Sequence, residues 1–377
     1  MADSILDRVL SSKEDQEKQL FHPLEILTTL LKTLSSKEAD VLRRRYGLTE
    51  QGKETLETIG SLYHVTRERI RQIESQSIAK MKASPAFAEV IKPVEHLVIS
   101  LLNQHGGVMT REMMFDVLLA ANDDTSQNRQ SIAFILNELL NDKLTPIPKS
   151  KKYLPGWKLV LASMEFVDQS IAALEAVIRE IGTPKIFDEL FEAFVQKPFY
   201  IANQQKLTED AVLAYIDISA KISKNPFDEY GLTEWGLILP KRMNDRVYLV
   251  LKKEGKPMHF EEIARRITKI FKKQAYPPTV HNELILNPEY VLVGRGIYAL
   301  REWGFTDGVV SNVIVAILKK AGTPLQRSEI VERVLQQRIV KKNTIHLALT
   351  DKHIFRKTND GKYTLAEPPV PTAISGA

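Results

Sequence analysis

Residues 66–74 read Thr-Arg-Glu-Arg-Ile-Arg-Gln-Ile-Glu, and this stretch decides how the first part of the chain folds. An α-helix advances about 100° per residue, so it would place Ile70 and Ile73 opposite a polar sector. Thr66 is a good N-cap, and an acid at position 68 suits the positive end of the helix dipole. The stretch therefore predicts an amphipathic helix whose polar sector holds Arg67, Glu68, Arg71 and Gln72.

The side chains of this polar sector match the hydrogen-bonding edges of DNA bases. Arg pairs with guanine, Gln with adenine, and Glu accepts from the cytosine amino group. An ordinary charged surface helix has a similar composition. The nine residues alone therefore leave DNA reading and simple solvation both open.

A second, shorter helix is expected just before this one, over residues 55–63. Gly60 is small where the two helices must approach closely, and His64 lies where the turn needs a left-handed backbone. The pattern predicts a helix-turn-helix, whose second helix enters the DNA major groove, in preference to a purely structural hairpin. Its small shared core would consist of Ile59, Tyr63, Val65, Ile70 and Ile73.

Residues 34–48 and 55–74 together resemble region 4 of the bacterial housekeeping-type sigma factors. The run from Val65 to Glu74 matches the recognition helix of that family without a gap, and the resemblance covers about residues 30–85. It implies that the module reads the −35 promoter element and docks on the flap of the RNA polymerase β subunit. The implied base contacts are Arg67, Glu68, Arg71 and Gln72, and we predict Thr66 as a further DNA-binding residue.

Downstream of this helix the chain departs from the family pattern. Gln76 and Ala79 stand where the family usually has charges, so Lys80 and Lys82 remain as the predicted phosphate contacts. Residues 43–45, all Arg, would touch phosphate or stabilise the module.

Too few residues precede the match to form the −10-recognising domain of a complete sigma factor. The spacing of their apolar residues predicts a helical lead-in over residues 1–29, ahead of a region-4-like module at 30–92. We therefore expect that this polypeptide alone does not open promoters in the usual way.

Composition places the chain among multidomain cytoplasmic proteins. A length of 377 residues predicts two or more domains. The absence of Cys excludes disulfides, thiolate metal sites and Cys nucleophiles, and it suits a reducing cytoplasm. The sequence shows no secretory signal and no apolar run long enough to cross a bilayer. The net charge of +5 permits a nucleic-acid partner without identifying one.

After Pro93 one layout recurs four times: an apolar helix, a break that contains Gly, two further helices and a closing strand pair. The breaks fall at Gly107, Gly182, Gly255 and Gly322, with spacings of 75, 73 and 67 residues. Three helices that end in a β-hairpin make a winged helix. The fold class predicted is therefore mainly α, with winged-helix repeats at 93–162, 165–240, 241–305 and 308–367 and a disordered tail over 368–377.

The third repeat resembles the HARE-type winged helix. That domain also forms the N-terminal part of the RNA polymerase delta subunit and is joined to some DNA-modifying or DNA-cleaving enzymes. The likeness rests on residues 255–263 (Gly-Lys-Pro-Met-His-Phe-Glu-Glu-Ile) and on the ending at residues 296–304. The fourth repeat shares several of these marks, whereas the first two are inferred from the internal repeat.

The basic residues of the third and fourth repeats leave two interpretations open. They could bind phosphate beside a groove, or they could form a solvated helix face beside Glu261 and Glu262. The second repeat is acidic, which favours protein contact or solvation there. Trp235 and Trp303 are predicted to fill the cores at the hairpin bases in preference to serving as base-stacking platforms. The basic residues are Arg265, Arg266, Lys269, Lys272, Lys273, Arg338, Lys341 and Lys342.

No catalytic constellation stands out in the sequence. The eight His residues are scattered, and there is no His-Glu-x-x-His, Walker-type loop or Gly-x-Ser-x-Gly motif. We expect no enzymatic activity, cofactor, metal, small-molecule substrate or membrane contact. The leading hypothesis is a sigma-like factor at the bacterial nucleoid that binds double-stranded promoter DNA and core RNA polymerase. The alternatives are a delta-like accessory subunit without promoter specificity, and a targeting module for a separately encoded DNA-modifying enzyme.

Overall fold

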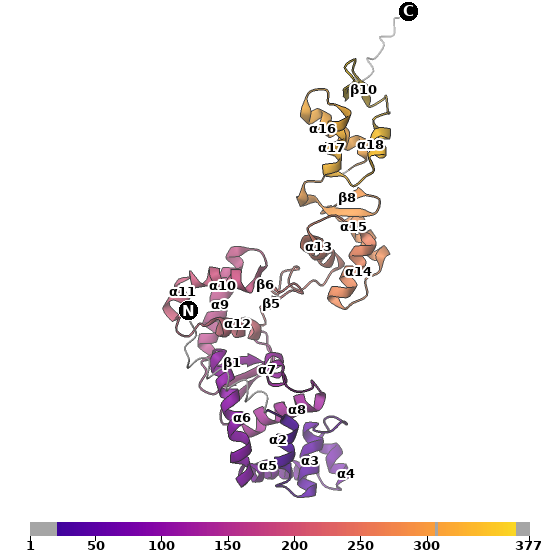
Figure 1. Ribbon diagram of the computed structural model, residues 1–377. Helices are drawn as coiled ribbons and strands as arrows, with labels where there is room; N and C mark the ends of the chain where they lie inside the picture. The colour runs from indigo at the N-terminus through magenta and orange to yellow at the C-terminus, as the bar shows by residue number, and fades with distance from the viewer. Residues whose placement is uncertain (1–20, 306–307, 367–377) are drawn as a thin grey trace, which may run out of the picture. The chain divides into compact units, whose positions relative to one another are not determined.

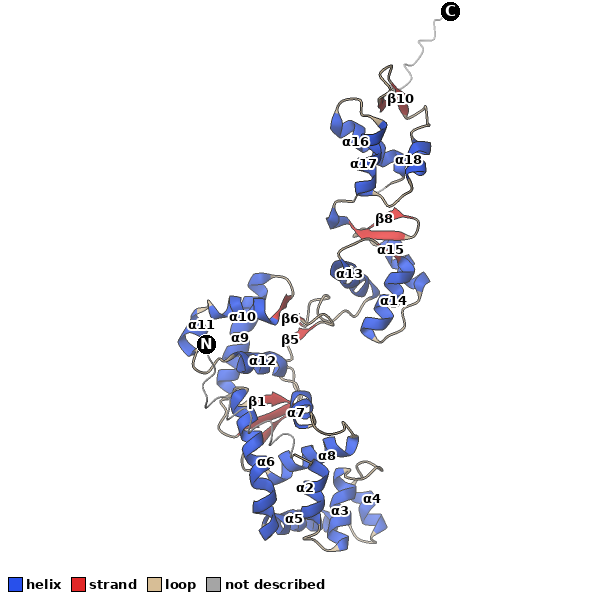
Figure 2. Ribbon diagram, viewed as in Figure 1, coloured by secondary structure: helices blue, strands red, loops and turns tan. Residues whose placement is uncertain are grey.

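The computed structural model describes residues 21–305 and 308–366, which divide after Glu234 into two compact units (Figure 1). Both units are mainly helical with short strands (Figure 2). Most of the lead-in and tail predicted from the sequence, residues 1–20 and 367–377, lies outside the described residues. Among the described residues, no helix is both long enough and apolar enough to span a bilayer.

The first unit begins with four helices whose ends are set by local sequence. α3 starts at a capping box, in which Ser35 and Glu38 bond each other's backbone N–H, and it ends at Gly47 with φ 68°. Thr55 and Thr66 cap α4 and α5 through their hydroxyl groups. These helices are α2 (Pro23–Leu31), α3 (Ser36–Tyr46), α4 (Leu56–Leu62) and α5 (Arg67–Lys82).

The turn between α4 and α5 has the geometry that the sequence predicts. His64 adopts a left-handed backbone with φ 54°. A Cβ atom on Gly60 would lie 2.7 Å from the carbonyl oxygen of Val65, so only Gly allows the second helix to start so close to the first. The predicted shared core forms, and Val41 of α3 joins it.

The long helix α6 (Pro85–Gln104) runs through the boundary expected at residue 93. Pro93 removes one backbone hydrogen bond inside this helix, a cost of about 3 kcal/mol in an isolated helix. The burial of Val94, Leu97 and Leu101 along the same helix offsets that cost. Consequently α6 carries the chain from the region-4-like segment into the first repeat without a break.

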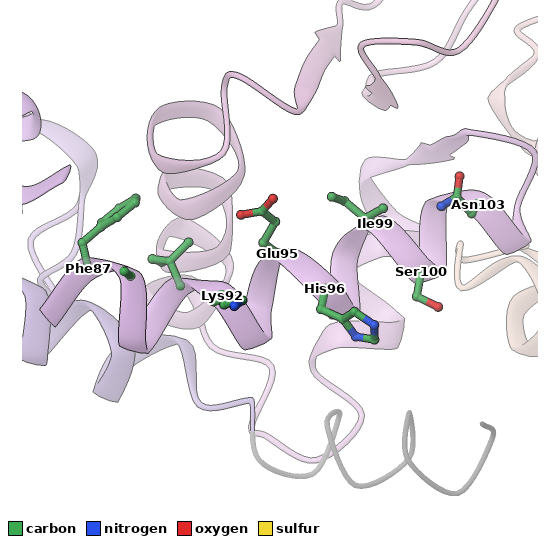
Figure 3. Close-up of a pocket in the computed structure, with 9 residues that line it drawn as sticks. Phe87, Lys92, Glu95, His96, Ile99, Ser100 and Asn103 are labelled. Carbon is green, nitrogen blue, oxygen red and sulfur yellow. The ribbon is translucent and has the colours of Figure 1, made fainter. Parts of the chain in front are cut away.

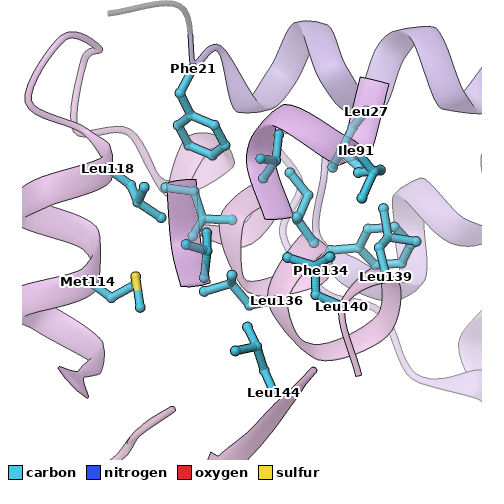
Figure 4. Packing of buried hydrophobic residues seen from close by; sticks show 14 of the residues in the cluster. Phe21, Leu27, Ile91, Met114, Leu118, Phe134, Leu136, Leu139, Leu140 and Leu144 are labelled. Carbon is cyan, nitrogen blue, oxygen red and sulfur yellow. The ribbon is translucent and has the colours of Figure 1, made fainter. Parts of the chain in front are cut away.

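One hydrophobic cluster joins the region-4-like segment to the first repeat. It contains Leu27 of α2, Leu42 of α3 and Met81 of α5 together with residues of the repeat such as Phe134 and Trp157. Figure 4 shows Leu27 of α2 and Ile91 of α6 beside Phe134 and Leu139 of the repeat. The two parts are thus built around a single core.

The first two repeats complete the first unit. Repeat 1 continues from α6 with β1 (Val108–Thr110), α7 (Arg111–Leu118), α8 (Ser126–Phe134), the π-helical turn η1 (Ile135–Leu139), β2 (Leu144–Ile147) and β3 (Gly156–Leu159). Repeat 2 comprises α9 (Met164–Ile181), β4 (Lys185–Ile186), α10 (Phe187–Val195), α11 (Pro198–Asn203), α12 (Glu209–Ile218), β5 (Ile222–Lys224) and β6 (Glu229–Leu232). The short helix α11 was not expected from the sequence.

The second unit holds the other two repeats. Repeat 3 comprises α13 (Met243–Glu254), β7 (Met258–His259), α14 (Phe260–Phe271), α15 (Pro277–Leu286), β8 (Tyr290–Gly294), β9 (Ile297–Leu300) and the 3-10 turn η2 (Arg301–Trp303). Repeat 4 comprises α16 (Val310–Ala321), α17 (Arg327–Gln337), α18 (Lys342–Ala348), β10 (Phe355–Lys357) and β11 (Tyr363–Leu365).

The repeats share one sheet topology. In repeats 1 to 3 the strand after the first helix pairs with the last strand, which gives the orders β1-β3-β2, β4-β6-β5 and β7-β9-β8. In repeat 4 a single bridge between Leu325 and Tyr363 takes the place of the first strand. The sequence predicted only the closing strand pair, because a strand of two or three residues leaves no periodic pattern. The Gly breaks are confirmed as helix ends: Gly182, Gly255 and Gly322 have φ values of 71°, 64° and 64°.

Repeats 3 and 4 are joined by a buried arginine. The side chain of Arg338 is 4% exposed and donates to the backbone carbonyl groups of Leu292 and Gly308. The next residue, Ile339, donates its N–H to the carbonyl oxygen of Val293 at 2.9 Å and so extends the edge of β8. The phosphate-binding interpretation of Arg338 is therefore wrong, because the guanidinium is enclosed by backbone.

The tryptophans pack as core residues. Trp157 is 2% exposed, and its indole N–H donates to Oδ1 of Asn137 at 2.8 Å. Trp303 packs against the core of repeat 3, as predicted, and Trp235 is half-buried.

Candidate nucleic-acid interface

The helix α5 presents the predicted polar face to solvent. Its cap, Thr66, accepts the N–H of Arg69 at 3.2 Å, while Ile70 and Ile73 are buried beneath the helix. The exposed residues of its first two turns are Arg67, Glu68, Arg69, Arg71 and Gln72. Both α4 and α3 pack against the buried side of α5 and fix its position.

Glu68 and Arg71 form an ion pair on this face. Nη2 of Arg71 lies 2.7 Å from Oε1 of Glu68, and Nε lies 3.0 Å from the other carboxylate oxygen. The hydrogen bond from Arg71 lowers the pKa of the Glu68 carboxyl group. The two side chains are 60% and 56% exposed, so solvent screens the attraction between them. The pair holds both groups in place without enclosing them.

Arg69 is a polar residue of this face that the sequence pattern did not single out. Its Nη1 donates to Oε1 of Gln72 at 3.1 Å. The spacing of three residues was the available signal, since side chains at i and i+3 are neighbours on a helix. Arg69 therefore orients the amide of Gln72 in the free protein.

The two lysines at the other end of α5 make contacts within the protein. Nζ of Lys80 donates to Oε2 of Glu38 at 3.0 Å, and Nζ of Lys82 donates to Oδ1 of Asn141 at 2.8 Å. The backbone N–H of Ser35, then its hydroxyl group and Lys80, lower the pKa of Glu38 to about 2. Both lysines help to fix α5 to its neighbours, and their contact with phosphate stays a prediction.

The arginines at residues 43–45 include two that brace the helix-turn-helix. Arg44 bonds Asp40 at 2.7 Å and Glu54 at 2.9 Å, and Asp40 also accepts the hydroxyl group of Tyr63 at 2.6 Å. Nε of Arg45 lies 3.4 Å from a carboxylate oxygen of Glu74 on α5. For these two residues the geometry corresponds to the stabilising role, which was one of the two that the sequence left open.

A pocket of about 640 Å³ runs along the flank of α6 (Figure 3). It is separate from the face of α5, and its described lining mixes apolar residues such as Ile91 and Ile99 with Lys92, Glu95 and His96. All nine described lining residues belong to α6 itself. Because a single helix supplies them, we assign no chemistry to this pocket.

Comparison with known proteins identifies the segment that carries the face of α5. Residues 30–83 match the family model described as Sigma-70, region 4. The chain is 55% identical over 58 residues to RNA polymerase sigma factor SigA1 of Synechococcus elongatus, which covers 15% of this chain and 14% of that protein. It is 46% identical over 78 residues to SigA of Nostoc sp., and 40% identical over 82 residues to SigA of Lactococcus lactis subsp. cremoris.

These matches are short in both chains. They cover 20% of the Nostoc protein and of this chain, and 22% of each for Lactococcus. The chain thus spans about a fifth of the length of these relatives, or less. Within that segment the match supports a sigma-like, helix-turn-helix DNA-binding role in transcription.

Proposed function

We propose that this protein is an atypical sigma-like initiation factor whose helix α5 binds a −35-type promoter element. The observation that carries the proposal is the exposed face of Arg67, Glu68, Arg71 and Gln72, on a helix-turn-helix that matches sigma region 4. Each of the four side chains is of a type that pairs with a base edge in the major groove.

On binding, Glu68 and Arg71 can exchange their ion pair for contacts with bases. Separating a pair as exposed and solvent-screened as Glu68 and Arg71 costs little. A good bidentate contact between an arginine and guanine contributes about 1–3 kcal/mol of discrimination. The pair therefore orients the two side chains in the free protein without preventing them from turning to the bases.

The remaining predicted DNA contacts come from the two ends of α5. Thr66 begins the helix and fixes the direction of its first turn. Lys80 and Lys82 would contact phosphate only by leaving Glu38 and Asn141, and the side chain of Lys80 is already 53% exposed. We assign them a positioning contribution that carries no sequence information.

The same segment supports attachment to core RNA polymerase, for which we propose the β flap as the docking site and the bacterial nucleoid as the location. We propose that the four repeats are winged-helix modules, of which the third is HARE-type. The shared order of strands and the closing hairpins support this interpretation. The proposed modules keep the boundaries predicted from the sequence, apart from the continuous helix and core at residue 93.

Selection of bound sequences from a random pool of duplex DNA tests the proposal. We expect the full chain to enrich one motif, and Arg67→Ala to abolish the enrichment at one position. A parallel pull-down should retain core RNA polymerase. A pool that stays random with properly folded protein would contradict promoter recognition by α5.

An accessory, delta-like polymerase subunit without promoter specificity is the second candidate. It is favoured by the small share of the chain, 15–22%, that matches sigma factors. It predicts recovery of core polymerase with no enriched motif. A targeting module for a DNA-modifying enzyme predicts that such an enzyme, and not polymerase, co-purifies with the chain.

A further inference from the structure

The third helices of repeats 1 and 2 are covered by other segments of the protein. In the fully described segment 127–140, which covers most of α8 and all of η1, no residue is exposed. This segment packs against α2, α3 and α5. A helix with no exposed residue over this segment has no free face to insert into a DNA groove, so repeat 1 serves as a support for the region-4-like segment.

Repeat 2 uses its third helix in the same way. The helix α12 packs against β1 of repeat 1, and the hydroxyl group of Tyr215 donates to the carbonyl oxygen of Gly106 at 3.0 Å. The backbone N–H of Leu154 donates to the carbonyl oxygen of Ile218 at 2.8 Å. Residues 211–220 are all buried or half-buried. Neither repeat of the first unit can therefore read DNA with its third helix.

Repeat 3 leaves its third helix free but without charge to hold phosphate. The segment from Tyr276 to the end of α15 contains no Lys or Arg. Its exposed side chains include Tyr276, Ile285 and Leu286, which are 64%, 60% and 80% exposed. On the preceding helix Arg265 and Arg266 are paired, at 2.6 Å and 3.1 Å from the carboxylate of Glu262. Lys269, Lys272 and Lys273 have no carboxylate within 4.0 Å among the described residues, but they belong to α14 and the loop after it and not to the third helix.

Repeat 4 has both a free third helix and a large excess of positive charge. Residues 308–367 contain 11 Lys and Arg against 5 Asp and Glu, a formal charge of +6, whereas residues 1–234 have 28 against 34, a charge of −6. From the N-cap of α18 to the closing hairpin, five lysines have no carboxylate within 4.0 Å among the described residues. This lysine set consists of Lys341, Lys342, Lys352, Lys357 and Lys362.

The cations of the hairpin occupy both of its faces. Lys357 pairs with the buried Tyr363 and shares the core-facing side with it, but Lys357 is exposed there. Phe355 of β10 and Tyr363 of β11 are buried, and side chains alternate along a strand, so Arg356 and Lys362 project from the opposite face. Nη2 of Arg327 donates to the hydroxyl group of Tyr363 at 3.1 Å and adds a further guanidinium beside the hairpin. The hairpin follows α18 and lies at the end of repeat 4 that is away from repeat 3 (Figure 1).

We propose that the lysine set of repeat 4 binds the phosphates of duplex DNA without sequence preference, as a second contact independent of α5. Unpaired lysines on an uncovered third helix and its hairpin attract the phosphates of a polyanion. Contacts of this kind do not distinguish one base from another. The choice of duplex DNA as the polyanion rests on the proposed function of α5. A duplex held by α5 raises the local concentration of phosphate around any other basic module of the chain.

The salt dependence of binding by the full chain tests this proposal. Fluorescence anisotropy with a labelled random-sequence duplex is measured between 50 and 200 mM KCl for the parent and for a fourfold variant. The variant carries Lys342→Gln, Lys352→Gln, Lys357→Gln and Lys362→Gln. Removing one phosphate contact should reduce the slope of log K against log salt by about 0.9. Over this range the affinity of the parent should then fall about 100-fold more than that of the variant.

A matched control removes the same charge from the first unit. It carries Lys92→Gln, Lys149→Gln, Lys151→Gln and Lys206→Gln, all at exposed positions. The control should keep the slope of the parent. Equal slopes for both fourfold variants would overturn the proposal, and so would displacement of the duplex by single-stranded RNA at lower concentration than by unlabelled duplex.

The two proposals fail in distinguishable ways. Arg67→Ala should lose the preference for a selected motif over the random duplex and keep the steep salt dependence. The repeat 4 variant should keep the preference for the selected motif and show a shallower slope of log K against log salt. The parent could show no preference for a motif while its salt slope still depends on the lysine set. In that case α5 does not read promoters, and repeat 4 binds duplex DNA without sequence preference.

Discussion

Replacing Phe134 should weaken the region-4-like helices although the residue lies about 50 positions beyond the end of the sigma match. Phe134 is 2% exposed, and its ring meets that of Tyr46 of α3 edge-on with 4.5 Å between centroids. A buried Phe→Ala change costs about 3–5 kcal/mol, and an aromatic pair contributes about 0.5–1.5 kcal/mol beyond its buried area. These values compare with the roughly 5–15 kcal/mol by which natural proteins are stable.

Hydrogen exchange by mass spectrometry measures where this stability is lost. Phe134→Ala should accelerate exchange in peptides from α3 and α5 as well as in peptides from α8, by about two to four orders of magnitude for amides that open with the core. Phe134→Leu keeps most of the volume and should cost about 1 kcal/mol, which provides the matched control. Exchange that accelerated only in repeat 1, while α3 and α5 kept their protection, would show that the two parts do not share one core.

Three further predictions concern the region-4-like segment. Arg67→Ala and Gln72→Ala should each relax sequence choice by about 1–3 kcal/mol at one base pair, measured by competition between duplexes that differ at that position, and equal loss for every sequence would contradict base readout. Gly60→Ala should destabilise the protein by about 1–3 kcal/mol in urea unfolding, because the new methyl group meets the carbonyl oxygen of Val65, and an unchanged midpoint would contradict the close approach. Glu38→Gln should lower the melting temperature at pH 7. Because folding depresses the pKa of Glu38, its stabilisation is present above the unfolded value of 4.5 and is lost as the pH falls toward 2, so the parent and the variant should converge there.

The local features of the region-4-like segment could be predicted from sequence alone. Thr66 caps α5, His64 takes the left-handed turn, and Ile70 and Ile73 face the core, because each depends on residues at most a few positions away. The glycines that end the first helices of repeats 2 to 4 belong to the same class, since a positive φ is a property of one residue. The exposed face of α5 follows from helical periodicity in the same way.

Other properties depend on which surfaces meet in the folded chain, and local sequence does not determine them. Pro93 favours a helix end by local rules, but burial on both sides of it keeps α6 continuous. Arg338 has the sequence context of an exposed cation, yet the carbonyl groups of Leu292 and Gly308 enclose it.

The third helices of the four repeats show most clearly the difference between what local sequence determines and what long-range packing determines. Their sequences allow all four to be surface helices, but α8 and α12 are covered by segments distant in the chain, and repeat 4 keeps its lysines free. Side-chain periodicity tells which face of a helix is apolar. It does not tell which partner covers the remaining faces, because that contact is set by long-range packing, to which residues far apart in sequence contribute together.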